Sequence, residues 1–282
     1  MKPLNVESLC QIAHSAGQRI MTYFQTDQIF VQKKSDQSPV TQADMASHHE
    51  IIKQLHAVDC TIPVLSEESL ESDLIRRKSW SRYWLIDPLD GTKEFIHGRR
   101  EFTVNIALIE ENSPTLSVVY APPDDLFYFA ERGKGAFTRH KLNGVSQALA
   151  TRRVPQNANG EPQLTVLNSR YSGHDRLPQL LGRLKGKTSE KQVGSSLKVC
   201  LIAEGKADLY PRLGPTSEWD TAAAQLVLEE AGGQVCSLNF ESLRYNLRDH
   251  LKNDDFIALG DKQFDWKNWL NISGLSSQPN HS

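Results

Sequence analysis

The most informative segment of the chain is Trp84-Leu85-Ile86-Asp87-Pro88-Leu89-Asp90-Gly91-Thr92-Lys93-Glu94-Phe95. The apolar run before Asp87 predicts a buried strand. Pro88 is expected to end this strand, because proline cannot donate a backbone hydrogen bond. Asp87 and Asp90 are three residues apart around a stiff turn, so both carboxylates can point at one spot.

Two carboxylates at one spot repel each other and stay ionised at low cost only with a positive charge between them. A hard divalent cation fits this requirement, and the Leu89 carbonyl offers a third oxygen ligand. Gly91 lets the backbone approach a ligand closely. The N–H groups of a helix opening at Thr92 would face an anion. Metal oxygens beside a helix N-terminus indicate phosphate chemistry.

An ordinary turn is the alternative interpretation of the same residues. Asp, Pro and Gly each suit tight turns for their own conformational reasons, and a turn needs no ligand. The metal hypothesis therefore requires further acidic ligands elsewhere in the chain.

The composition is that of a soluble globular protein. The 282 residues suit one large α/β unit or two closely joined halves, with 39% hydrophobic and 23% charged residues. A net charge of −2 gives no global field to recruit nucleic acid or acidic membrane. We expect a small-molecule partner and no nucleic acid. Monomer and homodimer are both compatible with the sequence.

The cysteine pattern and the N-terminus point to a reducing compartment. The four cysteines are far apart and form no C-x-x-C pair, which argues against zinc and favours buried free thiols: Cys10, Cys60, Cys200 and Cys236. The start lacks a signal-peptide pattern, and no apolar run approaches the roughly 20 residues that span a bilayer. We expect a cytoplasmic protein; peripheral attachment at the inner face of the cell membrane stays open, since no anchor is visible.

Helices and a loop are predicted before the central stretch. Residues 5–24 show a helical apolar stripe, and residues 31–44 are polar and turn-rich, as in a surface loop. A second helix is expected from about Thr41. It carries His48 and His49, which cannot easily share a metal because adjacent helical side chains face different ways. We interpret both as solvated.

A short strand at residues 62–65 leads to Ser66 and two acids, Glu67 and Glu68. Successive strand side chains point in opposite directions, so only one acid is expected to face a given site. We favour Glu67 as the inward ligand because it follows the strand so closely. A plain polar strand end is the alternative.

Consecutive strands are predicted after the central stretch. They lie at residues 102–109, 116–120, 126–130 and 135–137 and indicate an antiparallel meander rather than a doubly wound sheet. Residues 141–163 look like a connection between halves. We expect an N-terminal metal-binding half at 1–150, a C-terminal half at 151–272 that completes the site, and a flexible tail at 273–282.

Two helix starts stand out in the C-terminal half. Gly194-Ser195-Ser196 precede an apolar-periodic run with Lys198 one turn in, which could hold an anion or be a simple capped helix. A strong helix follows Trp219, with Asp220 as the expected N-cap and glycines at its end. A capping carboxylate is held rigidly, so Asp220 can be only a cap or also a cation ligand.

Taken together, these motifs resemble the inositol monophosphatase superfamily of metal-dependent, lithium-sensitive phosphatases. The resemblance rests on Glu67-Glu68 after a strand, Asp87-Pro88-Leu89-Asp90-Gly91-Thr92 and Trp219-Asp220-Thr221-Ala222-Ala223, in the family's order and over most of the chain. The bisphosphate nucleotidase branch is the more similar one. This second resemblance is carried by Leu65-Ser66-Glu67-Glu68, Lys93-Glu94-Phe95-Ile96, Gly194-Ser195-Ser196-Leu197-Lys198 and Tyr210-Pro211-Arg212.

The resemblance implies a layered α-β-α-β-α sandwich and a site for two to three Mg²⁺ ions. It implies metal ligands at Glu67, Asp87, Asp90, Asp220 and the Leu89 carbonyl. It implies that Asp36 and Thr92 orient the attacking water and that Asp44 is a second loop acid near the metal. The implied substrate contacts are the following: Glu67, Leu89, Asp90, Gly91, Thr92, Ser195, Ser196, Lys198, Arg212 and Asp220.

The implied activity is Mg²⁺-dependent removal of the 3′-phosphate of adenosine 3′,5′-bisphosphate, and by extension of its 5′-phosphosulfate form, as in sulfur assimilation. An inositol monophosphatase or another phosphatase of the superfamily is the nearest alternative. A phosphate-binding regulatory protein without catalysis is a second. The complete acid set disfavours it, because four uncompensated carboxylates at one site are costly without metal. A polymerase-type two-metal enzyme is disfavoured by the near-neutral charge and the lack of a basic stripe.

Overall fold

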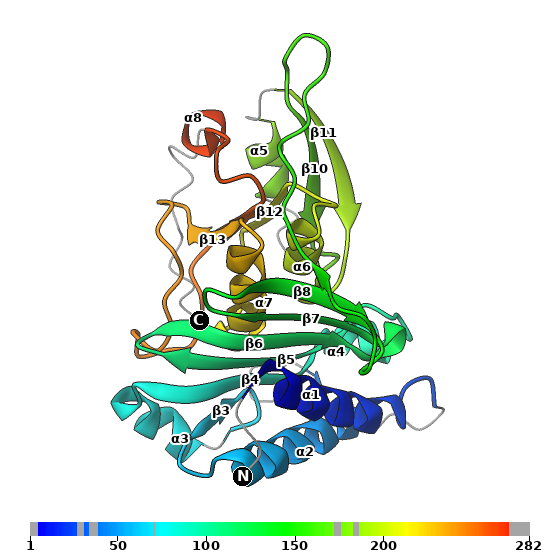
Figure 1. Cartoon of the computed structure of the whole chain (residues 1–282), viewed down its shortest axis with the longest axis vertical. Coiled ribbons are helices and arrows are strands. Elements are labelled where there is room, and N and C mark those ends of the chain that lie inside the picture. The colour runs from blue at the N-terminus through cyan, green and yellow to red at the C-terminus, as the bar shows by residue number, and fades with distance from the viewer. Residues whose placement is uncertain are drawn as a thin grey trace.

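The computed structural model describes residues 5–26, 31–33, 39–69, 71–171, 176–182 and 186–270. These residues build alternating layers of helix and sheet, which Figure 1 shows stacked along the long axis. The predicted α-β-α-β-α sandwich is therefore confirmed. The division into halves at residue 150 stays a prediction, and the tail at 273–282 lies outside the described residues.

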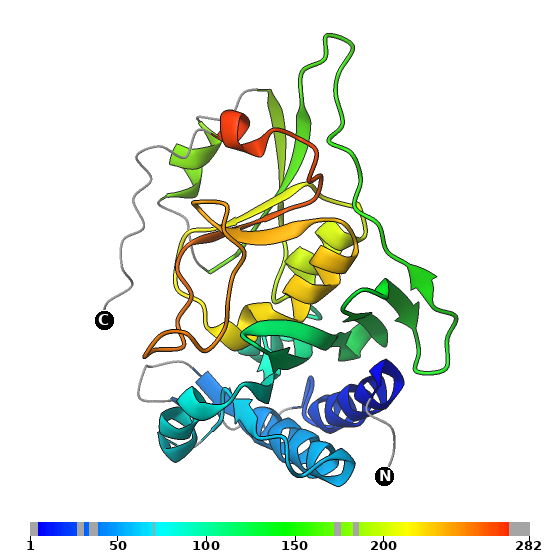
Figure 2. The same ribbon diagram turned by 60° about the vertical axis from the view of Figure 1, so that its left-hand side comes forward.

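The outermost helical layer consists of α1 (Val6–Met21) and α2 (Gln42–Val58), as predicted. Each begins with a capping box, at Asn5 and at Thr41, which satisfies helix N–H groups that lack an intrahelical partner. Their apolar faces pack on one face of a seven-stranded sheet (Figures 1 and 2). A short hairpin of β1 (Val31–Lys33) and β2 (Pro39–Thr41) precedes α2, where the sequence predicted only a loop.

The large sheet has the order β3-β4-β5-β6-β7-β8-β9 and contains the predicted meander. Only β3 and β4 pair in parallel; the other neighbours are antiparallel. Its strands are β3 (Val64–Ser66), β4 (Arg82–Asp90), β5 (Thr103–Glu110), β6 (Ser113–Ala121), β7 (Leu126–Glu131), β8 (Gly135–His140) and β9 (Gln147–Ala148). Short helices α3 (Glu71–Arg76), η1 (Arg77–Ser79), α4 (Thr92–Ile96) and η2 (Pro122–Asp124) connect them.

Side chains of β4 alternate between two cores, as the period of a strand requires. Trp84 and Ile86 join the core under α1 and α2, whereas Tyr83 and Leu85 join the core under the middle helices. This middle layer, α6 (Leu197–Ala203) and α7 (Glu218–Glu230), is buried between the two sheets.

The second sheet has five strands in the order β11-β10-β12-β14-β13. They are β10 (Gln163–Asn168), β11 (Lys187–Gln192), β12 (Leu209–Arg212), β13 (Gln234–Ser237) and β14 (Phe256–Leu259). A third core lies on its outer face under α8 (Trp266–Leu270), and α5 (Leu177–Leu181) lies in the same outer layer (Figure 1). The layer order brings α7 of the C-terminal half against the sheet that carries β4.

Two local predictions were wrong. Pro88 does not end its strand, because β4 continues to Asp90 through a register shift between Asp87 and Asp90. The strand pairing is interrupted at this shift, so the backbone N–H that Pro88 lacks is not needed there. His48 is not solvated, because its ring is buried and its Nδ1 lies 2.9 Å from the Ser66 hydroxyl.

The cysteine prediction holds for three positions. All four cysteines are free thiols, and Cys10, Cys200 and Cys236 are buried. Cys60 is exposed, because it lies in the turn after α2 rather than in a core.

Candidate metal and phosphate site

The irregularity in β4 creates the acidic centre. In a regular strand, residues three apart point to opposite faces. The register shift between Asp87 and Asp90 cancels this alternation. Both carboxylates therefore meet on one side, together with Asp220 of α7. One carboxylate oxygen from each of the three lies within 4.8 Å of the others.

Glu67 joins this centre from the end of β3. Its N–H donates to the Ile86 carbonyl at 3.1 Å, which fixes it beside β4. Glu67 lines the same pocket as Asp87, Leu89 and Asp220. Glu68 lines a different groove. The structure thus brings together the five residues proposed as ligands from the sequence, although they come from three separate elements.

Burial and mutual repulsion outweigh the favourable interactions at two of these carboxylates. Burial, with the charges of Glu67, Asp90 and Asp220, raises the pKa of Asp87 well above its usual value. The enclosed position of Asp220 and the charge of Asp90 raise the pKa of Asp220 to about 7. A set of oxygen donors with too much negative charge fits a hard divalent cation.

Asp90 is oriented by Ser196, which was predicted as a substrate contact, and by Thr103 and Asn105, which were not predicted from the sequence. Its Oδ2 accepts the Ser196 N–H at 2.6 Å and the Asn105 amide at 3.3 Å, and lies 3.5 Å from the Thr103 hydroxyl. Within the described residues, these hydrogen bonds all go to Oδ2 of Asp90. Its Oδ1 is therefore left to contact a cation. Thr103 and Asn105 could have been noticed as alternating polar residues in an otherwise apolar strand.

Ser196 does not cap α6 in the predicted way. Its side chain makes no capping bond; its Oγ lies 2.8 Å from both Asp90 Oδ2 and the Asp220 carbonyl. The anion at this helix start is thus the Asp90 carboxylate. Ser196 ties β4 to α7 across the site.

The prediction that Asp220 is the N-cap of α7 is wrong. The helix begins at Glu218, its N-cap is Ser217, and Asp220 is the third helical residue. The Asp220 Oδ2 accepts the Ser217 N–H at 2.8 Å in a capping box. The expected rigidity of the carboxylate therefore has a different geometric origin.

Thr92 and Asp44 form a pair beside the acidic centre. The Thr92 hydroxyl lies 3.2 Å from Asp44 Oδ1 and 3.2 Å from the Leu89 carbonyl. Asp44 is buried, and its other oxygen accepts the Thr41 N–H at 2.8 Å. Asp36, the other predicted water-orienting acid, lies outside the described residues.

Gly91 has the backbone geometry that only glycine adopts without strain. Its φ is +94°, and a Cβ there would lie 3.1 Å from the Glu101 carbonyl oxygen. This conformation turns the chain from β4 into α4, so that Thr92 faces the centre.

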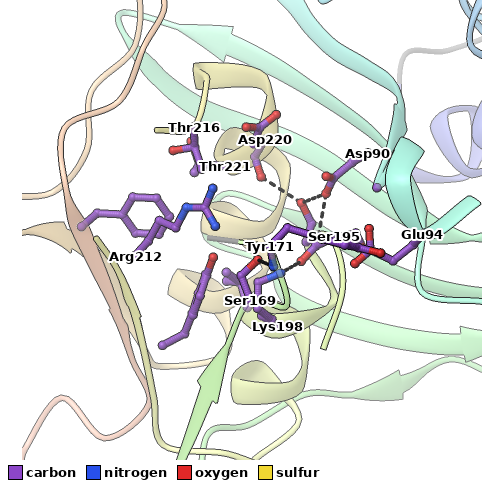
Figure 3. A pocket seen from close by; sticks show the side chains of 15 residues that line it. Asp90, Glu94, Ser169, Tyr171, Ser195, Lys198, Arg212, Thr216, Asp220 and Thr221 are labelled. Carbon is purple, nitrogen blue, oxygen red and sulfur yellow. Dashed lines mark hydrogen bonds between the residues drawn. The ribbon is translucent and has the colours of Figure 1, made fainter. Parts of the chain in front are cut away.

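A pocket extends from the acidic centre between the two sheets (Figure 3). Asp90 and Arg212 face it from opposite sides in that view, and Lys198 lies on its floor. The Lys198 ammonium donates to the carbonyls of Ser195 at 2.6 Å and Val193 at 3.2 Å, which holds the loop before α6. Lining residues that the sequence did not suggest are Glu94, Ser169, Tyr171, Val199, Tyr210, Thr216, Thr221 and Phe256.

The site therefore combines clustered acids, a threonine–aspartate pair and an adjoining pocket lined by two cationic side chains. A sequence model of the inositol monophosphatase family aligns with residues 5–265. The chain belongs to the inositol monophosphatase family. The structural comparison agrees with this assignment. The chain superposes on a solved CysQ from Bacteroides thetaiotaomicron, described as a bacterial member of that family. The TM-score is 0.76 at 33% identity, over 90% of this chain and 96% of that one.

Curated relatives within the family are also similar over nearly their whole length. The chain is 43% identical over 252 residues to the 3′(2′),5′-bisphosphate nucleotidase CysQ of Salmonella typhimurium, covering 89% of this chain and 98% of the relative. The relative of the same name in Haemophilus influenzae is 36% identical over 256 residues, covering 91% and 93%. An inositol monophosphatase from Anabaena, at 21% identity and a TM-score of 0.71 over 98% of this chain and 96% of that one, shares the fold.

Proposed function

We propose that this protein is a Mg²⁺-dependent 3′(2′),5′-bisphosphate nucleotidase. It hydrolyses the 3′-phosphate of adenosine 3′,5′-bisphosphate, so that one water is consumed and AMP and inorganic phosphate are released. The observation that supports it most is the convergence of Asp87, Asp90 and Asp220 within 4.8 Å beside a pocket with Lys198 and Arg212. The curated relatives of this name support the choice of substrate.

The proposed metal ligands are carboxylates and one carbonyl. Glu67, Asp87, Asp90, Asp220 and the Leu89 carbonyl line one pocket and would hold two to three Mg²⁺ ions. When bound, Mg²⁺ supplies Lewis acidity and neutralises phosphoryl charge. The raised pKa of Asp220 supports this assignment, since it comes from burial and from repulsion by Asp90, and a bound cation would offset both.

Thr92 and Asp44 are the proposed water-orienting pair. The Thr92 hydroxyl can donate its proton to Asp44 Oδ1, which turns an oxygen lone pair toward the acidic centre. A water that donates to this lone pair is oriented with its own oxygen toward the phosphorus. Asp44 is itself fixed by the Thr41 N–H, so the pair is preorganised.

The phosphate and the nucleoside are expected to lie at opposite ends of the pocket. The N–H groups at Gly91 and Thr92 face the phosphoryl group at the start of α4. Ser195, Lys198 and Arg212 would hold the nucleoside and its second phosphate.

Phosphate release tests the proposal. The full chain, stripped with EDTA and then reloaded, is assayed on adenosine 3′,5′-bisphosphate with and without Mg²⁺, and the nucleotide product is identified by chromatography. Mg²⁺-dependent formation of 5′-AMP supports the proposal. Formation of 3′-AMP, or turnover that persists in EDTA, contradicts it.

Cellular location is the remaining part of the proposal. Of the helices in the described ranges, none has the length and apolar character needed to cross a membrane. We propose that the enzyme acts in the cytoplasm, with any attachment to the membrane being peripheral. Lithium inhibition stays a prediction.

A further inference from the structure

A buried amide side chain, that of Asn253, holds the start of α7 from behind. Its Nδ2 donates to the Ser217 carbonyl at 2.8 Å and lies 3.1 and 3.2 Å from the hydroxyls of Thr221 and Thr216. The backbone N–H of Asn253 donates to the Thr216 carbonyl at 2.9 Å. Asn253 is only 4% exposed, so these contacts form without competition from water.

The hydrogen bonds of Asn253 to Thr216 and Ser217 act on the backbone that contacts the Asp220 carboxylate. The peptide group between Thr216 and Ser217 accepts at its carbonyl from the Asn253 N–H and donates through its own N–H to Asp220 Oδ2. The next peptide is held in the same way: its carbonyl accepts from the Asn253 amide, and its N–H donates to the Leu251 carbonyl at 2.8 Å. Two consecutive peptide planes are therefore fixed on both sides.

The segment that contains Asn253, residues 246–253, is here named the strap, and it is anchored to the N-terminal part of the chain. Arg77, which is 1% exposed, donates to the carbonyls of Arg248 at 2.9 Å and Asp249 at 2.7 Å and to Asn246 Oδ1 at 2.6 Å. Arg77 belongs to η1, just before β4. The strap thus connects the approach to the Asp87/Asp90 strand with the helix that carries Asp220.

We propose that Asn253 is a positioning residue that sets Asp220 against Asp87 and Asp90 and thereby determines the affinity for Mg²⁺. This inference rests on the proposed function, in which these carboxylates share metal. Carboxylates at one site repel each other, and the neutral amide opposes that repulsion without adding charge. Its loss lets Asp220 move away, and a fixed coordination geometry is what Mg²⁺ demands.

Direct Mg²⁺ titration of the metal-stripped full chain tests the proposal. Isothermal titration calorimetry of Asn253→Ala is expected to give a Mg²⁺ Kd at least about tenfold above that of the parent. The KM for the bisphosphate substrate, measured at saturating Mg²⁺, is expected to change by less than about twofold, because a positioning role acts on the metal. A purely structural role would lower the Tm and leave the Mg²⁺ Kd unchanged, and that result overturns the proposal.

Further variants keep the test decisive. If Asn253→Ala does not fold, Arg77→Met, which releases the strap far from the carboxylates, is measured instead. A parent-like Mg²⁺ Kd in that variant overturns the proposal. Asn112→Ala is the matched control, since Asn112 holds the Tyr245 carbonyl at 2.7 Å just before the strap. It should keep the parent Kd, and an equal weakening there also overturns the proposal.

Asp220→Asn separates this inference from the proposed function. If Asp220→Asn abolishes Mg²⁺ binding while Asn253→Ala leaves it intact, the positioning role alone is wrong. If Asp220→Asn itself binds Mg²⁺ as the parent does, the ligand assignment of the proposed function is wrong.

Discussion

The Thr92 hydroxyl lies 3.2 Å from the Asp44 carboxylate, although the two residues are 48 positions apart in the chain. Thr92 opens α4 and Asp44 lies in the first turn of α2, so this contact joins two helix starts at the edge of the acidic centre. It supports Asp44 as the acid that orients water together with Thr92.

Thr92→Val is expected to lower kcat about 100-fold or more, because it removes the hydroxyl that orients water while nearly conserving volume. Asp44→Asn should have an effect of similar size. Since the two groups act as one unit, the double variant should be little worse than either single one. Steady-state kinetics at saturating Mg²⁺ measure this. If the reduction in kcat of the double variant equals the product of the two single reductions, the two residues act independently.

Asp90→Asn is expected to lower kcat/KM by about a thousand-fold, which corresponds to roughly 4 kcal/mol of transition-state stabilisation. The amide keeps the size of the side chain but weakens its interaction with a divalent cation. Asp124→Asn is a suitable control, because Asp124 is an acid on the surface that contacts Arg100 and lies outside the acidic centre and the strap. A near-parent rate for Asp90→Asn with Mg²⁺ would remove Asp90 from the metal site.

The metal-free protein is expected to lose stability as the pH rises. The pKa values of Asp87 and Asp220 are raised on folding, so their contribution is fully present below the unfolded value of 3.8. The part due to Asp220 is lost as the pH rises through about 7. Thermal unfolding in EDTA should give a Tm several degrees lower at pH 8 than at pH 5.

Adding Mg²⁺ at pH 8 should restore much of that loss, because the cation binds the ionised carboxylates only in the folded state. Asp220→Asn should show a smaller dependence of Tm on pH in EDTA. A pH dependence as large as that of the parent would mean that other groups cause the effect.

Gly91→Ala is expected to lower the free energy of unfolding by about 1–3 kcal/mol, because alanine is strained at the φ of +94° found here. The new methyl group would also press on the Glu101 carbonyl and shift the start of α4. Activity should fall with stability, as measured by urea unfolding and phosphate release. Gly133→Ala is the control, since Gly133 has φ +76° but open space around it, and only stability should change there.

The antiparallel meander and the acidic motifs were predictable because their signals are local, whereas the layered sandwich was predicted only through the resemblance to a family. The apolar run into Asp87 and the Pro-x-Asp-Gly turn are short motifs, and the helix after Trp219 has strong periodicity. Their convergence depends on contacts between distant elements, and the resemblance to a family supplied that part.

Other features depend on contacts that no local pattern records. The strand β11 is polar and largely exposed, and it forms by pairing with β10. No strand pattern could therefore be recognised there. His48 lies on the buried face of α2 with Ile51 and Leu55, and its Nδ1 lies 2.9 Å from the hydroxyl of Ser66 on another element. Asp220 was misplaced as the N-cap because Ser217, three positions earlier, forms the same capping box with it.

The most direct test of the central claim compares kcat/KM for adenosine 3′,5′-bisphosphate and inositol 1-phosphate on the same enzyme preparation, with Mg²⁺ and after its removal. The proposed function predicts a clear preference for the bisphosphate nucleotide, and activity that disappears in EDTA and returns with Mg²⁺. A preference for inositol 1-phosphate would contradict the assigned substrate, and full activity without a divalent cation would contradict the metal site itself.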